Sequence, residues 1–495
     1  EVVPLTMVLV GLYVILVRRE RKMGLALSAM SVLWLLIAFV VVIPRFSPHG
    51  QSPYLAPSEL GEEALTYSSF YSSLGDSADE IVVRLITQPS LLLERVAGRT
   101  GLAYINALLS PLAYVPLLGL PVLLLATPTL LMNLLSDYAI QQRVTHFFHY
   151  AVLMVPFLTV AALDGAIFLA RRLHRPLGKL LPTERRPEMA AAAIFAALSG
   201  LILLASLFTQ WRHGFLPFSR DFYLVERSER MDAAEAIVEQ VPPVGVVSAD
   251  HTLVPHLSQR ESIYIYPSLR SADYVVADVT YRDGPFNPRD RHESIQQLLA
   301  ESRYGVIDGR HGYLLLERDL EQPAILDPFY DFARTQDASP QVELQVDFGQ
   351  DLRLVGYDLV WERPVTSRAY LTMYWQVLRP VDRDLRLFFI QTDPAGDPQP
   401  GTELEFAESV WYPPSRWSPG DVVRTETLHW SMEDPVEFGL ALGVVEGPGF
   451  WELDKRLKPA GSELPGTLPL VHGDTLLWLG TLGTDGQSVM LEPPG

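Results

Sequence analysis

The stretch "HYAVLMVPFLTVAALDGAIFLA" (residues 149–170) joins a histidine and a tyrosine to a long apolar run. A helix needs roughly 20 apolar residues, at about 1.5 Å rise each, to cross the hydrocarbon core of a bilayer. This run has that length, and Asp164 is its only charged residue. The stretch therefore predicts a membrane-spanning helix with a polar rim at its start.

Other apolar runs fill the first 210 residues. Residues 2–17, 24–43 and 189–209 each fit one span, the first being short. Residues 103–135 are too long for one span and contain helix-breaking prolines, so we expect a helical hairpin turning near residues 118–121. The sequence thus predicts a polytopic α-helical membrane domain of about six spans in residues 1–210.

Charge predicts the orientation of these spans. Lys and Arg cluster in residues 18–22 and 171–186, and short cytoplasmic loops are enriched in these residues. Six spans place both clusters on one side, and they place loops 44–101 and 136–148 on the other. The residues after 210, which are expected outside the cytoplasm, hold 24 Lys and Arg against 45 Asp and Glu and so carry a net charge of −21, against −19 for the whole chain. Nucleic acid is not expected as a partner of so acidic a chain.

Loop 44–101 contains two predicted amphipathic helices. Ser77 to Glu80 has the capping-box pattern before an apolar run of helical period, and Pro89 starts a second helix. Such helices are typical of a membrane face. The chain has no cysteine, so neither a disulfide framework nor a thiolate metal site is expected.

The acidic half predicts two soluble domains. Residues 211–317 alternate helix and strand, which indicates a small α/β domain, and residues 318–340 read as a linker. Residues 341–495 consist of short alternating segments separated by Pro, Gly and Asp, as in a jelly-roll-like β-sandwich. Asp250 and His251 follow the first α/β strand, where such sheets bind ligands, although helix capping and a surface histidine explain them more simply. Most tryptophans lie in the sandwich, and a place in its core is favoured over an exposed sugar-binding platform.

The rim supplies the candidate site. Arg143, His146 and His149 follow one another at intervals of three, so an early helix start would place them on one face, beside Tyr150. Arginine and histidines near the membrane interface suit a lipid phosphate or pyrophosphate, which needs charge-assisted donors. The alternative is an aromatic belt with interfacial histidines bonded to backbone or water. No cofactor is predicted, and a divalent metal ion has no support because two histidines alone form an incomplete ligand set.

Several ordered motifs carry a family resemblance. They are "YSSLGDSADEIVVRLITQPSLLLERV", "PLAYVPLLGLPVLLLATPTLLMNLLSD", "HFFHYAVLMVPFL", "VSADHTLVPHLSQRESIYIYP" and "ADYVVADV". Over roughly residues 1–317 the chain resembles the C-terminal two-thirds of DUF2079, an uncharacterised family of bacterial predicted membrane proteins. The pair Tyr374-Trp375 and "RWSPGDVV" (416–423) resemble a β-sandwich module appended to such proteins.

This family is similar to the GT-C glycosyltransferases, which transfer sugars from polyprenyl-phosphate donors outside the cytoplasmic membrane. The resemblance implies a multi-pass protein of the bacterial cytoplasmic membrane with extracytoplasmic C-terminal domains. It also implies a polyprenyl-phosphate sugar and a glycan or protein acceptor as partners, with His149, Tyr150, His146 and Arg143 as substrate-binding candidates. GT-C enzymes carry their catalytic acid in the first external loop. This chain starts at Glu1 without such a loop, so we expect an inactive fragment and assign no catalytic residue.

Two other function classes stay open. One is a noncatalytic, membrane-anchored protein that binds surface glycans, which exposed coplanar tryptophans would favour. The other is a transporter or flippase subunit, for which Asp164 would act as a proton or ion relay and more intramembrane charges are expected. Packing beside Gly165, or reach toward the inner interface, explains Asp164 without such a role.

Overall fold

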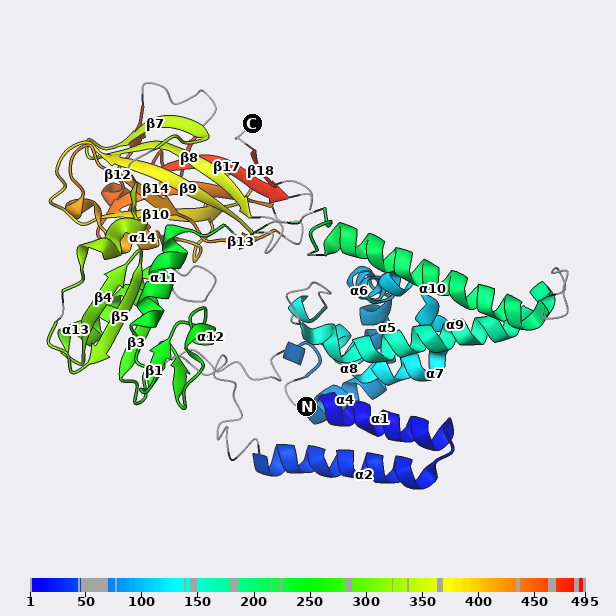
Figure 1. Cartoon of the computed structure of the whole chain (residues 1–495). Helices are drawn as coiled ribbons and strands as arrows, with labels where there is room; N and C mark the ends of the chain where they lie inside the picture. The colour runs from blue at the N-terminus through cyan, green and yellow to red at the C-terminus, as the bar shows by residue number, and fades with distance from the viewer. Residues whose placement is uncertain are drawn as a thin grey trace. The chain divides into compact units, whose positions relative to one another are not determined.

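The structure is a computed structural model, and it describes most but not all of the chain (Figure 1). The described residues are 2–42, 45, 70–75, 78–137, 139–142, 149–178, 186–214, 216–220, 222, 224, 226–280, 287–322, 324–335, 338–362, 368–432, 437–461, 469–484 and 489–492. They form two compact units, Glu1–Leu224 (unit 1) and Val225–Gly495 (unit 2). The change from apolar to acidic sequence after residue 210 thus falls close to the change of unit.

Unit 1 is helical. Its α-helices are α1 (Val2–Leu16), α2 (Arg21–Ile37), α4 (Ala78–Thr87), α5 (Pro89–Ala97), α6 (Arg99–Leu109), α7 (Leu120–Leu123), α8 (Thr127–Leu135), α9 (Val155–Gly178) and α10 (Arg186–His213). Among the described residues, four helical stretches are long and apolar enough to cross a membrane: Arg21–Val42, Val115–Leu135, His149–Leu173 and Met189–His213. The membrane character of unit 1 is therefore confirmed, whereas the number of six spans stays a prediction. The two amphipathic helices predicted after Ser77 are present as α4 and α5.

The proline-rich segment does not turn where we expected. The left-handed residues are Ala113 and Tyr114, with φ of 50° and 58°, so the chain changes direction before residues 118–121. Each later proline instead occupies the first turn of a short helical piece, as Pro121 does in α7. That position tolerates proline because its N–H would have no partner within the helix. The prolines thus divide residues 115–135 into short helices rather than forming the hairpin turn.

Two glycines bring this segment against α9. A Cβ added at Gly119 would lie 2.1 Å from the carbonyl oxygen of Ala161, and one added at Gly165 would lie 2.4 Å from that of Val115. Only glycine allows backbones to approach so closely, a feature typical of helix pairs in membranes. The two glycines therefore fix the packing of the second and third candidate spans.

The Lys- and Arg-rich segments of unit 1 lie at one end of its helices. The C-terminal ends of α1 and α9 and the N-terminal ends of α2 and α10 lie at one end of the unit in Figure 1, and the C-terminal ends of α8 and α10 lie at the other. The cationic residues 18–22, Arg171 and Arg172 belong to the first end. At the second end the backbone N–H of Asp137 donates to Phe70 O over 2.7 Å, which joins the two predicted external loops.

Unit 2 starts with a five-stranded sheet between helices. Its strands are β1 (Val247–Ala249), β2 (Ile263–Ile265), β3 (Tyr274–Asp278), β4 (Tyr304–Arg310) and β5 (Tyr313–Arg318). They are ordered β2-β1-β3-β5-β4, with β1 parallel to β2 and β3, and β5 antiparallel to β3 and β4. Alternate residues face opposite layers. Val276 packs in the cluster of α11 (Glu229–Glu239) and α12 (Val254–Leu257), and Val275 packs in that of α13 (Pro288–Ala300).

Two antiparallel sheets follow. One contains β11 (Leu404–Glu405), β10 (Leu385–Thr392), β14 (Glu437–Glu446), β17 (Leu476–Thr484) and β16 (Leu470–Val471), with β18 (Val489–Glu492) also paired to β17. The other contains β15 (Pro459–Ala460), β7 (Val342–Phe348), β8 (Leu352–Glu362), β9 (Arg368–Val377), β12 (Val422–Glu426) and β6 (Arg334–Thr335), with β13 (Trp430–Ser431) also paired to β9. Trp375 is fully buried in their shared core.

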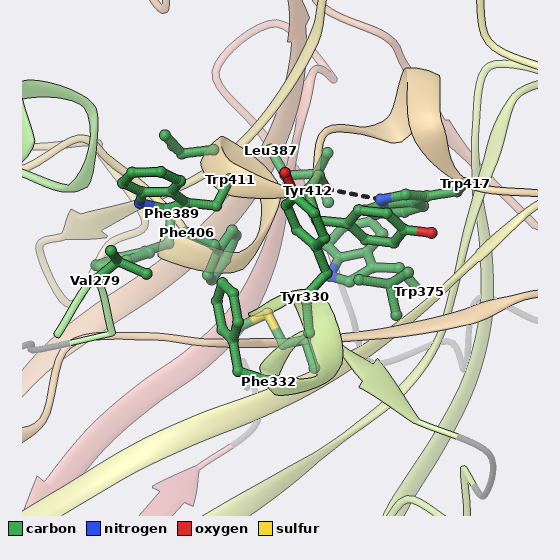
Figure 2. Close-up of a cluster of buried hydrophobic side chains, with 14 of the residues drawn as sticks. Val279, Tyr330, Phe332, Trp375, Leu387, Phe389, Phe406, Trp411, Tyr412 and Trp417 are labelled. Carbon is green, nitrogen blue, oxygen red and sulfur yellow. Dashed lines mark hydrogen bonds between the residues drawn. The ribbon is translucent and has the colours of Figure 1, made fainter. Parts of the chain in front are cut away.

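One hydrophobic core runs from the α/β sheet into these two sheets. Residues 318–340, expected to be a linker, contribute to it through the 3-10 helix Asp327–Phe332, whose Phe329 is fully buried. Figure 2 shows Tyr330 and Phe332 from this segment beside Trp411, Tyr412 and Trp417. This segment is part of the core and not a linker because Phe329, Tyr330 and Phe332 are buried. The free energy gained by burying these side chains exceeds the preference of the neighbouring prolines and aspartates for an exposed loop.

The same segment covers an edge of the α/β sheet. β4 is the outermost strand, and the N–H of Val306 donates to Gln322 O over 2.6 Å. Just beyond β4, the N–H of Gly312 donates to Phe329 O over 2.9 Å. Because these donors are paired, the edge strand is closed by residues outside the sheet.

Helix α13 also joins the two halves of unit 2. The Arg289 guanidinium donates through Nε to Glu405 Oε2 over 2.9 Å, and through Nη2 to the other carboxylate oxygen. The ring of His292 packs edge-on against Trp411, with 4.7 Å between centroids. Burial, together with the charge of Arg289, lowers the pKa of His292 to about 4. His292 is therefore neutral at pH 7 in the folded protein.

Candidate functional site

Two of the four predicted site residues lie among the described residues. The chain enters the third candidate span as a 3-10 helix, His149–Met154, in which His149 is exposed and Tyr150 is half-buried. Their rings stack with 4.7 Å between centroids and 26° between planes. Arg143 and His146 lie outside the described residues, so the shared face of the set stays a prediction.

The buried side-chain amide of Asn133 is hydrogen-bonded to the backbone of Tyr150. The side-chain Nδ2 of Asn133 in α8 donates to Tyr150 O over 3.1 Å and to the Tyr104 hydroxyl over 2.7 Å. Asn133 is 5% exposed, so both bonds lie in an apolar interior where unpaired polar groups are costly. Sequence reasoning did not single out Asn133, although an asparagine inside the apolar run "LLMNLL" was a usable signal.

An ion pair lies just past the end of α8. Arg95 Nη2 donates to Asp137 Oδ1 over 2.7 Å and to Ser73 Oγ over 2.8 Å. The Ser73 backbone N–H and hydroxyl also donate to the Asp137 carboxylate, over 2.9 and 2.7 Å. Burial opposes ionisation of this carboxylate, but the donors of Ser73 and Arg95 outweigh it and lower the pKa of Asp137.

We call His149, Tyr150, Arg95, Asp137 and Ser73 the outer rim. All five belong to the end of unit 1 where α8 ends, because Tyr150 is bonded to Asn133 within α8 and Asp137 follows that helix by two residues. The Arg95 side chain is 33% exposed, so part of its guanidinium reaches the surface. The outer rim thus offers histidine, tyrosine and arginine donors at one end of a membrane-embedded bundle.

Asp164 lies on the exposed face of α9. Its neighbour Gly165 is buried against the preceding helical segment. Away from their ends, the described parts of the candidate spans contain no second Asp, Glu, Lys or Arg. A relay of charged groups, which the transporter class needs, is therefore not found in this part of the chain.

In unit 2 the carboxyl end of β1 is filled by a buried ion pair. Asp250 Oδ2 accepts from Arg291 Nη1 and from the backbone N–H of Asp278, each over 2.6 Å. The side chains of Asp250 and Arg291 are each 3% exposed. His251 is half-buried beside them. Asp250 therefore stabilises the sheet edge and does not present a ligand-binding carboxylate.

A second ion pair adjoins the first. Asp278 accepts from Arg230 Nη2 over 2.6 Å and from the backbone and hydroxyl of Thr280. Burial raises the pKa of the Asp278 carboxyl, but Arg230 and Thr280 outweigh it and lower that pKa below its ordinary value. The Arg230 side chain is 34% exposed and so leads from this cluster to the surface.

Neither a cluster of metal ligands nor a platform of exposed tryptophans is found among the described residues. No group of three or more His, Asp or Glu side chains there is arranged to hold a metal ion. Of the tryptophans in the two antiparallel sheets, Trp451 is exposed at 38%, whereas Trp375, Trp411 and Trp417 are buried. A platform of coplanar exposed tryptophans, which the glycan-binding class would favour, is therefore not seen among them.

The fold and the outer rim define a multi-pass membrane protein with a large β-rich C-terminal unit. The chain belongs to DUF2079, a family of predicted membrane proteins, whose signature it matches over residues 1–315. Comparison with curated proteins and with solved structures gave no match. The match ends within β5, so the two antiparallel sheets lie beyond the part that defines the family.

Proposed function

We propose that this protein is a GT-C-like membrane glycosyltransferase component that binds a polyprenyl-phosphate-linked sugar at the outer face of the bacterial cytoplasmic membrane. The observation that carries the proposal is the outer rim, where the exposed His149 stacks on Tyr150 at the start of a candidate span. We assign no residue of this chain to the general base. The role proposed for the rim is to hold and orient the lipid phosphate.

The chemistry of the rim suits this ligand. A phosphate offers several acceptor oxygens and negative charge, and it is held best by charge-assisted donors. The donor of His149 is an imidazole N–H and that of Tyr150 is its hydroxyl, and Arg95 has guanidinium N–H groups beyond those bonded to Asp137 and Ser73. The apolar helices below would accommodate the polyprenyl chain.

The charge distribution of unit 1 supports the proposed orientation. Residues 18–22, Arg171 and Arg172 belong to the end of the bundle opposite the rim, as cytoplasmic cations would. Helix α10 runs from that end toward the rim end, where the chain leaves unit 1. Unit 2 is accordingly proposed to be extracytoplasmic, with a glycan or protein as the acceptor.

A binding experiment tests the rim. The full chain in lipid nanodiscs would be titrated with radiolabelled polyprenyl-phosphate sugars, as wild type and as His149→Ala and Tyr150→Phe. Loss of one hydrogen bond to a charged group is worth about 1.5–3 kcal/mol, so we expect binding at least about tenfold weaker in each variant. Release of labelled sugar in the same samples would test transfer separately from binding.

Two matched substitutions serve as controls. His256→Ala removes an exposed histidine of unit 2, and Tyr114→Phe removes the hydroxyl of a tyrosine of unit 1 that is 45% exposed. Both are expected to bind like wild type. If the His149 and Tyr150 variants insert normally and bind as tightly as wild type, the rim is an aromatic belt and the proposal fails.

A further inference from the structure

A polar cleft lies inside unit 2, where the α/β sheet meets the antiparallel sheets. It opens beside the start of α11, the end of β3 and the strands β9 and β12. Its volume of about 770 Å³ falls within the roughly 300–1,000 Å³ typical of small-molecule sites. Arg230 and Asp278 form one wall, at the carboxyl end of a parallel strand, where α/β sheets bind ligands.

Charged and polar side chains dominate the cleft, with Phe332 as its single apolar residue among those described. The lining includes four arginines and the six carboxylates of Glu229, Asp278, Asp331, Glu362, Glu408 and Glu426. Carboxylates outnumber arginines in this set. An excess of negative charge repels anions, so phosphates, sulfates and uronic acids are disfavoured as ligands.

Two arginines of the cleft, Arg230 and Arg424, have guanidinium N–H groups beyond those in their hydrogen bonds. Each guanidinium has five N–H donors. Arg230 donates one N–H to the Asp278 carboxylate and one to the Tyr313 hydroxyl. Arg424 donates to Phe332 O over 3.4 Å, and its Nε lies 3.6 Å from Glu426. Donors and carboxylate acceptors thus both line the cleft, a combination that matches hydroxyl groups, since each hydroxyl both donates and accepts.

An aromatic face completes the cleft. The rings of Tyr370 and His429 stack with 4.0 Å between centroids and 7° between planes. The Nε2 atom of His429 is 3.8 Å from Glu426 Oε2 and has no hydrogen-bond partner among the described residues. A buried polar atom without a partner is costly, and a ligand group within reach would remove that cost. Aromatic rings pack against the C–H face of sugars in sugar-binding sites, and this pair supplies the aromatic part of the cleft lining.

From these features we propose that the cleft binds a neutral, hydroxyl-rich ligand, namely an uncharged oligosaccharide. The inference concerns unit 2 alone and does not depend on a lipid-linked sugar binding at the outer rim. It places sugar recognition on Tyr370, His429 and the cleft arginines, not on an exposed tryptophan.

Saturation-transfer NMR on the full chain in nanodiscs tests this inference. The probes are the neutral trisaccharides maltotriose, mannotriose and chitotriose, with trigalacturonate as the anionic counterpart. We expect saturable binding of at least one neutral probe and markedly weaker binding of trigalacturonate. Tyr370→Ala and His429→Ala should each weaken binding about tenfold or more, the loss expected for one close contact. Arg368→Gln, a milder change at the start of β9, should weaken it as well.

Trp451→Ala is the matched control, because Trp451 is the exposed tryptophan of the same unit. It should bind like wild type, and an unchanged near-ultraviolet circular dichroism spectrum would show that each variant is folded. The inference is overturned if no neutral probe binds, if trigalacturonate binds better, or if Trp451→Ala loses binding while folded cleft variants keep it.

Discussion

The substitution Arg291→Met tests the buried ion pair at the edge of the α/β sheet. Methionine keeps most of the length of the arginine side chain but removes its donors. Arg291 Nη1 donates to Asp250 Oδ2 over 2.6 Å and to Asp278 O over 2.7 Å, and both side chains of the pair are 3% exposed. The variant therefore leaves the Asp250 carboxylate buried without its cation.

Breaking a buried pair in this way costs about 3–5 kcal/mol. For a unit of this size, 1 kcal/mol shifts the melting temperature by roughly 2–4 °C, so unit 2 should melt about 6–20 °C lower. Making both partners neutral, as in Asp250→Asn with Arg291→Met, should recover much of this loss because no unpaired charge remains.

The loss of stability caused by Arg291→Met should also depend on pH. Burial already raises the pKa of Asp250, with Arg291 opposing the shift, and loss of Arg291 would raise that pKa further. A carboxyl whose folded-state pKa exceeds its unfolded value of about 3.9 binds more protons in the folded state, so stability falls as pH rises through that interval. The loss of stability should therefore be larger at pH 8 than at pH 5.

Tryptophan fluorescence during heating provides the assay, because seven of the nine tryptophans lie after residue 341, in unit 2. Wild type, Arg291→Met and the double variant would be compared in nanodiscs at both pH values. A single variant as stable as wild type, or a double variant no more stable than the single one, would refute the reasoning.

Three further changes have defined outcomes. Asp137→Asn should expose residues 70–75 to limited proteolysis at neutral pH, and wild type should lose this protection only as pH falls through the lowered pKa of Asp137. His292→Gln should flatten the stability of unit 2 between pH 7 and 5, because a folded-state pKa of about 4 lets only the unfolded chain take up the proton there; equal slopes in thermal melts would contradict this. Trp375→Ala should cost about 3–5 kcal/mol in chemical unfolding because the ring is fully buried, whereas Trp451→Ala should cost under about 1 kcal/mol.

The sequence predicts the membrane spans but not the contacts between residues that are far apart in the chain. The apolar runs at 149–170 and 189–209 were sufficient to predict the spans that contain α9 and α10, because crossing a bilayer requires that length. Arg95 and Asp137 are 42 positions apart, and no local pattern marks them as partners. Their pairing depends on how α5 and α8 pack, which hydropathy does not encode.

Short elements were missed for a related reason. β2 has only three residues, Ile263–Ile265, and is defined by its parallel pairing with β1. Residues 318–340 carry prolines and aspartates that predict a linker, yet Phe329 becomes fully buried. In both cases tertiary contacts override the local signal. The family resemblance, by contrast, rests on ordered motifs and was confirmed over residues 1–315.

The closure of β4 has a consequence for chains cut at the end of the family match. Residue 315 lies before Gln322 and Phe329, whose carbonyls accept from the N–H groups of Val306 and Gly312. A truncation there would leave the outer strand with open donors beside an apolar face, a template for strand addition and aggregation. Residue 315, where the family match ends, is therefore a poor C-terminal boundary for expressing the α/β sheet of unit 2. A fragment that contains this sheet should also include the two antiparallel sheets.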